Sequence, residues 1–198
     1  KIPNSSYLDS TYTSTTSDCP IHQKMNSDGT TCLDLNCTLT IENNEGLQGY
    51  HLAAKVYSET KSLNMLKLLV KDYPEYAGNI NYFNENFLQY LGVSDDLITL
   101  IKLSKKINWY LLLTHENEYD DGNKKCFLVD IFFEGSNKLI NYLLDEFDFD
   151  WYELDTIPFF QIVKNEKINT KEKINILKKI SKKHDLNKIT KRGFNIIF

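Results

Sequence analysis

Arginine is nearly absent from this chain of 198 residues, in which 22 of the 23 basic residues are lysines and Arg192 is the exception. Readout of nucleic-acid bases favours arginine, because the guanidinium group forms bidentate hydrogen bonds. The composition therefore argues against a protein that reads base sequence. Together with 20 asparagines and 18 isoleucines, the lysine bias is typical of an A/T-rich genome, such as that of a parasite, an intracellular bacterium or a large DNA virus.

Long apolar runs are also missing. No run approaches the ~18 residues that a membrane-spanning helix needs. The N-terminal residues contain no apolar core of a secretory signal peptide. We therefore expect no transmembrane segment and a cytoplasmic location, which for a pathogen effector is the host cytosol. Hydrophobic residues make up 41% of the chain and aromatic residues 13%, which is sufficient for a folded core and argues against a disordered chain.

Signatures of catalysis are lacking as well. No glycine-rich nucleophile elbow, phosphate-binding loop or His-Glu-x-x-His motif occurs. A cysteine hydrolase needs a cysteine, a histidine and a group that orients the histidine. The chain has four cysteines and four histidines, but no such local signature joins them. We predict that the chain is not an enzyme and uses no cofactor, with a cysteine hydrolase as the catalytic alternative.

Three of the four cysteines lie near the N-terminus. Cys19, His22, Cys32 and Cys37 form a C-x2-H-x9-C-x4-C pattern, and four such ligands can close a tetrahedral zinc site. The spacing matches no standard zinc finger, and free thiols or a disulfide fit the same residues. The fourth cysteine, Cys126, begins an apolar block and is predicted to pack as a small hydrophobic residue.

Leucine-rich blocks recur along the rest of the chain. They begin at Met65, Leu97, Leu139 and Lys173, at spacings of 32, 42 and 34 residues. A shorter apolar block precedes each one, and a period of about 33 residues is typical of stacked helix pairs. We predict an irregular N-terminal segment over residues 1–45 and an all-α domain of short antiparallel helix pairs over residues 46–198.

Capping and turn signals predict where these helices begin and end. Ser62 and Ser94 are expected to cap second helices, because their side chains can accept hydrogen bonds from free N–H groups. Pro74 is expected to end a helix. An acidic segment over 115–123 reads as a surface loop. The expected pairs are 50–57 with 63–71, 87–91 with 94–106, 126–133 with 137–144, and 157–163 with 170–182.

The sequence of one predicted helix pair is similar to a known repeat consensus. Gly49-Tyr50-His51-Leu52-Ala53-Ala54 is followed by Met65-Leu66-Lys67-Leu68-Leu69. Together these segments resemble an ankyrin repeat, in which a Gly-x-Thr-Pro-Leu-His-Leu-Ala-Ala turn and helix precedes a leucine-rich helix. The other repeats keep the apolar skeleton, but no copy has the Thr-Pro pair and the usual Gly-Ala-Asp hairpin is absent. The resemblance covers about residues 46–198 and implies a solenoid of ankyrin-like pairs with a structural histidine at His51. The alternative is an irregular helical domain.

A helical repeat stack of this kind implies protein recognition. Turns and first helices line a concave groove that binds proteins. We therefore predict an adaptor or effector that recognises a partner protein. Core packing is the competing role for the two tryptophans, Trp109 and Trp151. The candidate partner contacts are polar or aromatic residues at predicted turns, namely Tyr82, Asn84, Glu85, Glu118, Tyr119, Asp120, Trp151 and Tyr152.

Two alternative functions use other parts of the chain. The N-terminal Cys/His segment would carry catalysis or zinc in an effector of a different kind. Residues 164–192 contain eleven basic and three acidic residues, so this segment would bind nucleic acid or an anionic membrane. A solvated helix face explains the same charges without any ligand.

Overall fold

The structure is a computed structural model that describes residues 23–25, 32–34, 41–118, 124–151 and 158–184. The chain divides into two units, Lys1–Leu39 and Thr40–Phe198, whereas the sequence analysis placed the boundary between residues 45 and 46. In the first unit, β1 (Gln23–Met25) and β2 (Cys32–Asp34) pair antiparallel. The sequence did not predict this hairpin.

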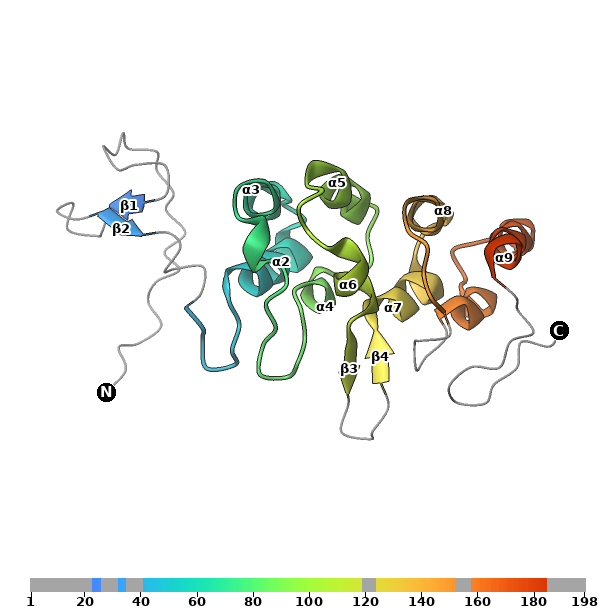
Figure 1. Cartoon of the computed structure of the whole chain (residues 1–198), viewed down its shortest axis with the longest axis horizontal. Coiled ribbons are helices and arrows are strands. Elements are labelled where there is room, and N and C mark those ends of the chain that lie inside the picture. Colours follow the sequence, from blue (N-terminus) through green and yellow to red (C-terminus); the bar gives the residue numbers. More distant parts are fainter. Residues whose placement is uncertain (1–22, 26–31, 35–40, 119–123, 152–157, 185–198) are drawn as a thin grey trace. The chain divides into compact units, whose positions relative to one another are not determined.

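The helices of the second unit lie in two rows (Figure 1). The first row contains α2 (Gly49–Thr60), α4 (Leu88–Leu91), α6 (Trp109–Thr114), α7 (Phe127–Glu134) and the 3-10 helix η2 (Pro158–Lys164). The second row contains α3 (Asn64–Asp72), α5 (Asp96–Leu103), α8 (Asn137–Glu146) and α9 (Thr170–Lys183). A short 3-10 helix, η1 (Pro74–Tyr76), follows α3.

Each helix packs mainly on the next helix of its own row. In the second row α3 packs on α5, α5 on α8, and α8 on α9. In the first row α2 packs on α4, α6 on α7, and α7 on η2, while α2–α3, α7–α8 and η2–α9 join the rows. The predicted all-α class is confirmed for the described residues, in which each strand is only three residues long.

All four leucine-rich blocks lie on second-row helices. Leu66, Ile98 and Ile140, the second residues of the first three blocks, are buried on α3, α5 and α8, as their spacing leads one to expect. The fourth block differs, because Ile176 and Ile180 are the buried residues of α9 and Ile174 is 45% exposed. The isoleucines of this helix fit two registers at helical spacing, so the sequence alone did not distinguish them.

The starts of the second-row helices follow the capping signals only in part. Ser94 Oγ accepts a hydrogen bond from the N–H of Asp96 at 3.2 Å, as expected. Ser62 does not cap α3, because no side chain accepts a hydrogen bond at the start of this helix. Helix α5 ends at Leu103 and not at the predicted residue 106.

The expected loop over residues 115–123 contains a second hairpin. Strands β3 (Glu116–Glu118) and β4 (Lys124–Cys126) pair antiparallel, with Asn117 opposite Lys125. The residues between the strands lie outside the described part of the chain. Helix α6, just before the hairpin, was not predicted.

Aromatic rings fill the space between the rows. Trp109 and Trp151 are 3% and 1% exposed, so both pack in the core, and Trp151 is not a surface contact. Trp151 meets Phe132 edge-on with ring centroids 5.6 Å apart. Cys126 is 1% exposed, which confirms its predicted packing. Among the described residues, no helix combines the length and apolarity needed to cross a bilayer.

Candidate protein-binding surface

Two turns of the second unit are built in the same way, 38 residues apart. Asn43 begins the first turn (43–47), before α2, and Asn81 begins the second turn (81–85), before α4. In both, the asparagine Oδ1 accepts hydrogen bonds from the N–H groups two and four residues later, each at 2.9 Å. The asparagine N–H donates to the carbonyl oxygen four residues later, at 3.1 and 3.0 Å. An asparagine that binds its own following backbone stabilises a turn, so the two segments are equivalent elements.

The two turns lie directly against one another. Gly46, the fourth residue of the first turn, has φ of 74°, a left-handed conformation that glycine adopts without strain. A Cβ atom on Gly46 would lie 2.6 Å from Cδ1 of Tyr82 and 2.8 Å from its backbone nitrogen. Only glycine fits here, and its absent side chain lets the second turn stack on the first.

The second turn also contacts the β3–β4 hairpin. The carbonyl oxygen of Asn84 accepts a hydrogen bond from Nε2 of His115 at 2.7 Å, and Nδ2 of Asn84 donates to the carbonyl oxygen of Glu116 at 3.4 Å. The two turns and the hairpin project on the same side of the first-row helices (Figure 1). We call residues 41–47, 80–85, 115–118 and 124–126 the turn row.

Apolar side chains are exposed on the turn row. Ile41 is 63% exposed, Tyr82 67% and Phe83 62%, and Ile80 is 44% exposed. A hydrogen bond with Glu42 raises the pKa of Tyr82 and links the hydroxyl to the residue just before the first turn. Single exposed apolar residues are ordinary, but neighbouring ones on adjoining elements mark interaction sites.

A buried polar network supports the two turns from beneath. His51 of α2 is fully buried, and its Nε2 donates to the carbonyl oxygen of Glu85 at 3.0 Å. Its Nδ1 accepts from the N–H of Gln48 at 3.3 Å, so the imidazole is neutral with the proton on Nε2. Burial lowers the pKa of His51 and maintains that state. His51 therefore has a structural role, as the family resemblance implied.

The predicted partner contacts are distributed unevenly over this structure. Tyr82 and Asn84 are exposed on the turn row. Glu85 is engaged internally, because its Oε2 accepts hydrogen bonds from the Tyr90 hydroxyl at 2.7 Å and from Asn81 Nδ2 at 3.0 Å. Burial, followed by the Glu85 carboxylate, raises the pKa of Tyr90. Glu118 lies on β3 with its side chain outside the described part, and Tyr119, Asp120 and Tyr152 also lie outside the described residues.

Metal and thiol chemistry have little support in the part of the chain that the structure describes. No three His, Cys, Asp or Glu side chains among these residues lie close enough to hold a metal ion. Burial raises the pKa of the Cys126 thiol to about 11, so it stays protonated and unreactive. Of the zinc candidates, Cys19, His22 and Cys37 lie outside the described residues, and Cys32 is on β2 with its side chain not described.

Sequence reasoning missed several members of this surface. Ile41, Ile80 and Phe83 were not singled out, although Phe83 lies in an asparagine-led turn and Ile41 and Ile80 come just before one. The signal was the recurrence of asparagine, with glycine or asparagine three residues later, 38 residues apart at Asn43 and Asn81. No protein-family model matches the chain, and no curated protein or solved structure matches it.

Proposed function

We propose that this chain is a protein-recognition module that binds a partner protein through the turn row. The observation that carries the proposal is the exposure of Tyr82 and Phe83 on the second of two stacked turns, together with that of Ile41 two residues before the first turn. Aromatic side chains on preorganised elements are typical anchors of protein interfaces, because their burial contributes a large apolar area at a small entropic cost. The proposal assigns no catalytic role to the described residues.

The same proposal includes an ankyrin-like repeat stack as the finer fold. Three features support it: helix pairs packed in two rows, turns that recur before successive first-row helices, and a buried histidine that binds the next turn. In such a stack the turns and first helices share one concave side, which is the side we assign to the partner. Leu111 of α6 and Phe133 of α7, 61% and 47% exposed, are further exposed apolar side chains of the first row.

The test is a pair of double variants compared with the natural chain. Proteins that the immobilised natural chain retains from a cell lysate are identified and purified. Each is then titrated with the natural chain and with the variants by calorimetry. Tyr82→Ser/Phe83→Ser is expected to raise the dissociation constant at least about tenfold, which is about 1.4 kcal/mol. Met65→Ser/Leu68→Ser is the matched control, because these α3 side chains are 52% and 54% exposed and lie away from the turn row.

Two results would count against the proposal. One is equal weakening by both double variants, which would mean that loss of exposed apolar area anywhere reduces binding. The other is unchanged binding by Tyr82→Ser/Phe83→Ser. Tyr119→Ala/Asp120→Ala then asks whether the residues between β3 and β4 in the sequence take part, since loss of a contact there is expected to weaken binding of the same partner without changing thermal stability.

A further inference from the structure

Helix α9 has six lysines and one acidic residue, Glu172, between Thr170 and Lys183. Both carboxylate oxygens of Glu172 accept hydrogen bonds at the start of the helix. Its Oε2 accepts from the N–H of Asn169 at 3.1 Å in a capping box, and its Oε1 accepts from Asn137 Nδ2 at 3.0 Å. The carboxylate therefore does not neutralise lysines elsewhere on the helix.

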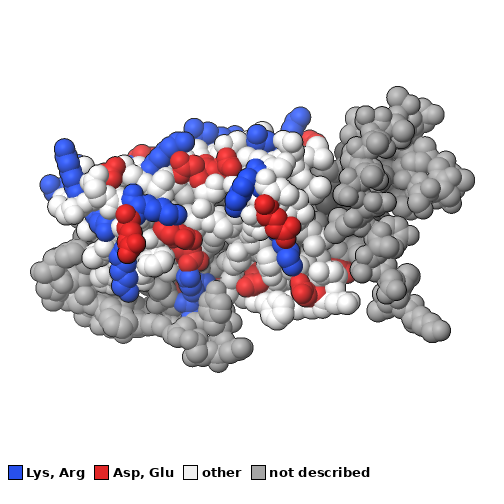
Figure 2. Space-filling view, turned by 180° about the vertical axis from the view of Figure 1, so that it is seen from behind, with Lys and Arg blue, Asp and Glu red and all other residues white. Residues whose placement is uncertain are grey.

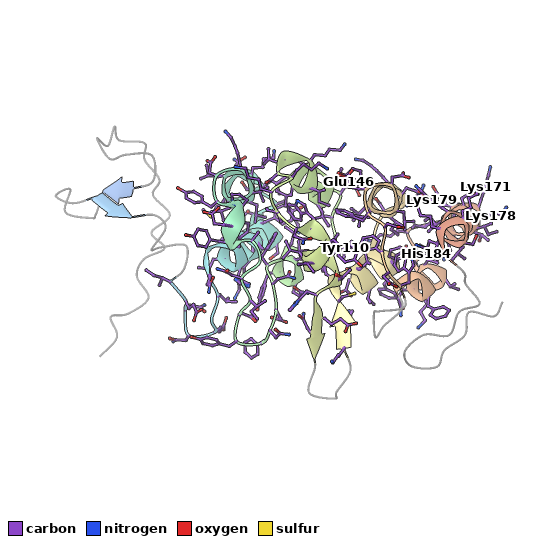
Figure 3. The ribbon with its side chains drawn as sticks, viewed as in Figure 1. Tyr110, Glu146, Lys171, Lys178, Lys179 and His184 are labelled. Carbon is purple, nitrogen blue, oxygen red and sulfur yellow. The ribbon has the colours of Figure 1, made fainter. Side chains whose placement is uncertain are left out.

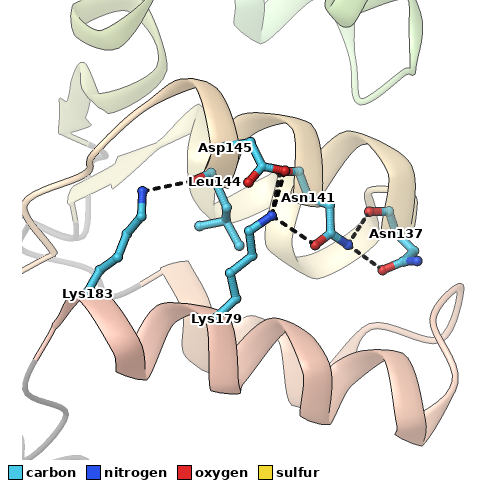
Figure 4. Close-up of polar contacts among 6 residues, drawn as sticks. All are labelled: Asn137, Asn141, Leu144, Asp145, Lys179 and Lys183. Atoms are coloured by element: carbon cyan, nitrogen blue, oxygen red, sulfur yellow. Dashed lines mark hydrogen bonds and ion pairs between the residues drawn. The ribbon is translucent and has the colours of Figure 1, made fainter.

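Three of the six lysines hold α9 against its neighbours. Lys179 Nζ lies 2.7 Å from the Asp145 carboxylate and donates to the carbonyl oxygen of Asn141 at 3.3 Å (Figure 4). Lys183 Nζ donates to the carbonyl oxygen of Leu144 at 3.2 Å. Lys173 Nζ donates to the carbonyl oxygen of Val163, in η2, at 2.8 Å. These lysines have a structural function, since Lys183 and Lys173 bind carbonyl groups near the ends of α8 and η2 and Lys179 binds the side of α8.

The other three, Lys171, Lys178 and Lys182, are exposed and have no acceptor among the described residues. Their spacing of seven and four residues puts them within about 40° of arc on one face and along about 16 Å of helix. That face is opposite the buried Ile176 and Ile180. Figure 3 shows Lys171 and Lys178 pointing away from α8 and Lys179 pointing toward it. We call Lys171, Lys178 and Lys182 the lysine stripe.

The stripe is unfavourable for the isolated helix. Lys178 and Lys182 are one turn apart, so their like charges repel. Lys171 lies in the first helical turn, where the helix dipole disfavours a positive charge. Figure 2 shows lysine side chains projecting along the edge formed by the second row, including its α9 end. A counter-charge from another molecule would remove both costs.

The neighbouring surface favours a protein as the source of that charge. Ile174 is 45% exposed beside the stripe, and an apolar side chain of a peptide can pack on it. A phosphodiester backbone offers no such contact, and three lysine–phosphate contacts alone give weak, strongly salt-dependent binding. The stripe also lacks arginine, the residue best suited to bidentate phosphate recognition.

We propose that the lysine stripe, with Ile174, is a docking surface for an acidic segment of a partner protein. It is a second surface, on a second-row helix, whereas the turn row projects from the first row. Carboxylates of the bound segment pair with the three ammonium groups, and an apolar residue of the segment covers Ile174. The chain can then hold two protein segments at once.

The experiment uses a fluorescently labelled poly-glutamate peptide with one central leucine, titrated with the full chain and followed by anisotropy. Lys171→Gln/Lys178→Gln/Lys182→Gln is expected to raise the dissociation constant about tenfold or more. The matched control is Lys55→Gln/Lys67→Gln/Lys71→Gln, which removes the same charge from exposed lysines of α2 and α3 that also have no acceptor among the described residues. The control is expected to change binding by no more than about twofold.

Equal loss in the two triple variants, or no binding of the peptide by the natural chain, would overturn the proposal. The same titrations with double-stranded DNA and with phosphatidylserine vesicles identify the anion. The proposal would also be overturned if DNA or the vesicles bound the natural chain more tightly than the peptide does and the lysine-stripe variant weakened that binding. Tyr82→Ser/Phe83→Ser is expected to bind the peptide normally, so failure at one surface is distinguishable from failure at the other.

Discussion

The imidazole of His51 on α2 donates a hydrogen bond to the carbonyl oxygen of Glu85, 34 residues further along the chain, at 3.0 Å. This contact joins the first helix pair to the second turn from inside the protein. The donation from Nε2 survives protonation, but the hydrogen bond that Nδ1 accepts from the Gln48 N–H requires the neutral imidazole. Stability and protonation at His51 are therefore linked.

The first prediction is a loss of stability on acidification. Burial lowers the pKa of His51 from its ordinary value of 6.5. The unfolded chain therefore binds this proton first, and the stabilisation present above pH 6.5 is lost as pH falls through the folded-state pKa. Thermal unfolding at pH 7.5 and 5.5 measures the slope. His51→Gln, which can still donate to Glu85, is expected to show a smaller decrease in Tm than the natural chain, and an identical decrease would contradict the assignment.

The second prediction concerns the stacked turns. Gly46→Ala is expected to destabilise the fold by about 1–3 kcal/mol, because the new Cβ meets Tyr82 in a left-handed backbone conformation. Gly92→Ala separates the two causes, since Gly92 has φ of 71° but no atom within 4 Å of the added Cβ. Gly78→Ala, with neither constraint, is expected to stabilise by about 0.4–1 kcal/mol. Urea unfolding of the three variants ranks them by their free energy of unfolding. A loss of stability in Gly46→Ala no greater than that in Gly92→Ala would show that the contact with Tyr82 contributes nothing.

The third prediction compares two buried asparagines. Asn117 is 2% exposed, and neither polar atom of its side chain has a hydrogen-bond partner in the described structure. Asn165 is fully buried, and its Nδ2 donates to the carbonyl oxygens of Phe132 at 3.1 Å and Gly135 at 2.9 Å. Asn117→Ala is expected to raise the free energy of unfolding by about 1 kcal/mol, and Asn165→Ala to lower it by about 2–3 kcal/mol.

Chemical denaturation of these two variants measures both changes in the free energy of unfolding. A lower stability of Asn117→Ala would mean that this amide is satisfied in solution, for example by a bound water. Such a result would leave the Asn165 comparison intact, because its hydrogen bonds are made within the protein.

The fourth prediction uses two adjacent lysines of α9. Lys179→Ala removes the contacts with Asp145 and Asn141 of α8 and is expected to lower stability by about 1 kcal/mol. Lys178→Ala removes a side chain of the lysine stripe and relieves repulsion from Lys182, so stability is expected to stay within about 0.5 kcal/mol of the natural value or to rise. Differential scanning calorimetry at low salt measures both. Equal losses would show that Lys178 also has a structural contact.

Periodic apolar burial explains what the sequence could predict. Leu66 on α3, Leu97 on α5 and Ile140 on α8 are buried because second-row helices bury one face each, and such a face appears in the sequence as a helical repeat. Helix α6 has no such signal, since Trp109-Tyr110-Leu111-Leu112-Leu113 is apolar on every side. The strands were missed because β3 and β4 are three residues long and polar, so main-chain pairing defines them without any alternating pattern.

The candidate site was predictable where it depends on local turn chemistry. Tyr82 and Asn84 are exposed because they belong to a turn that forms its own hydrogen bonds. Glu85 belongs to the same turn, yet its carboxylate binds the Tyr90 hydroxyl, a contact that only the folded arrangement creates. Trp151 had two roles compatible with its sequence position, and packing against Phe132 decided between them.

Sequential packing has a consequence for how this protein opens. In the second row α3 contacts α5, α5 contacts α8, and α8 contacts α9. The stability of each helix pair therefore depends mainly on its interfaces with the adjacent pairs. The central pair α7–α8 is supported from both sides, whereas α2–α3 and α9 have a described helical neighbour on one side only. Amide hydrogens should therefore exchange slowest in α7 and α8 and progressively faster toward both ends, as the unit frays inward. A partner that spans several turns would slow exchange at the ends more than at the centre.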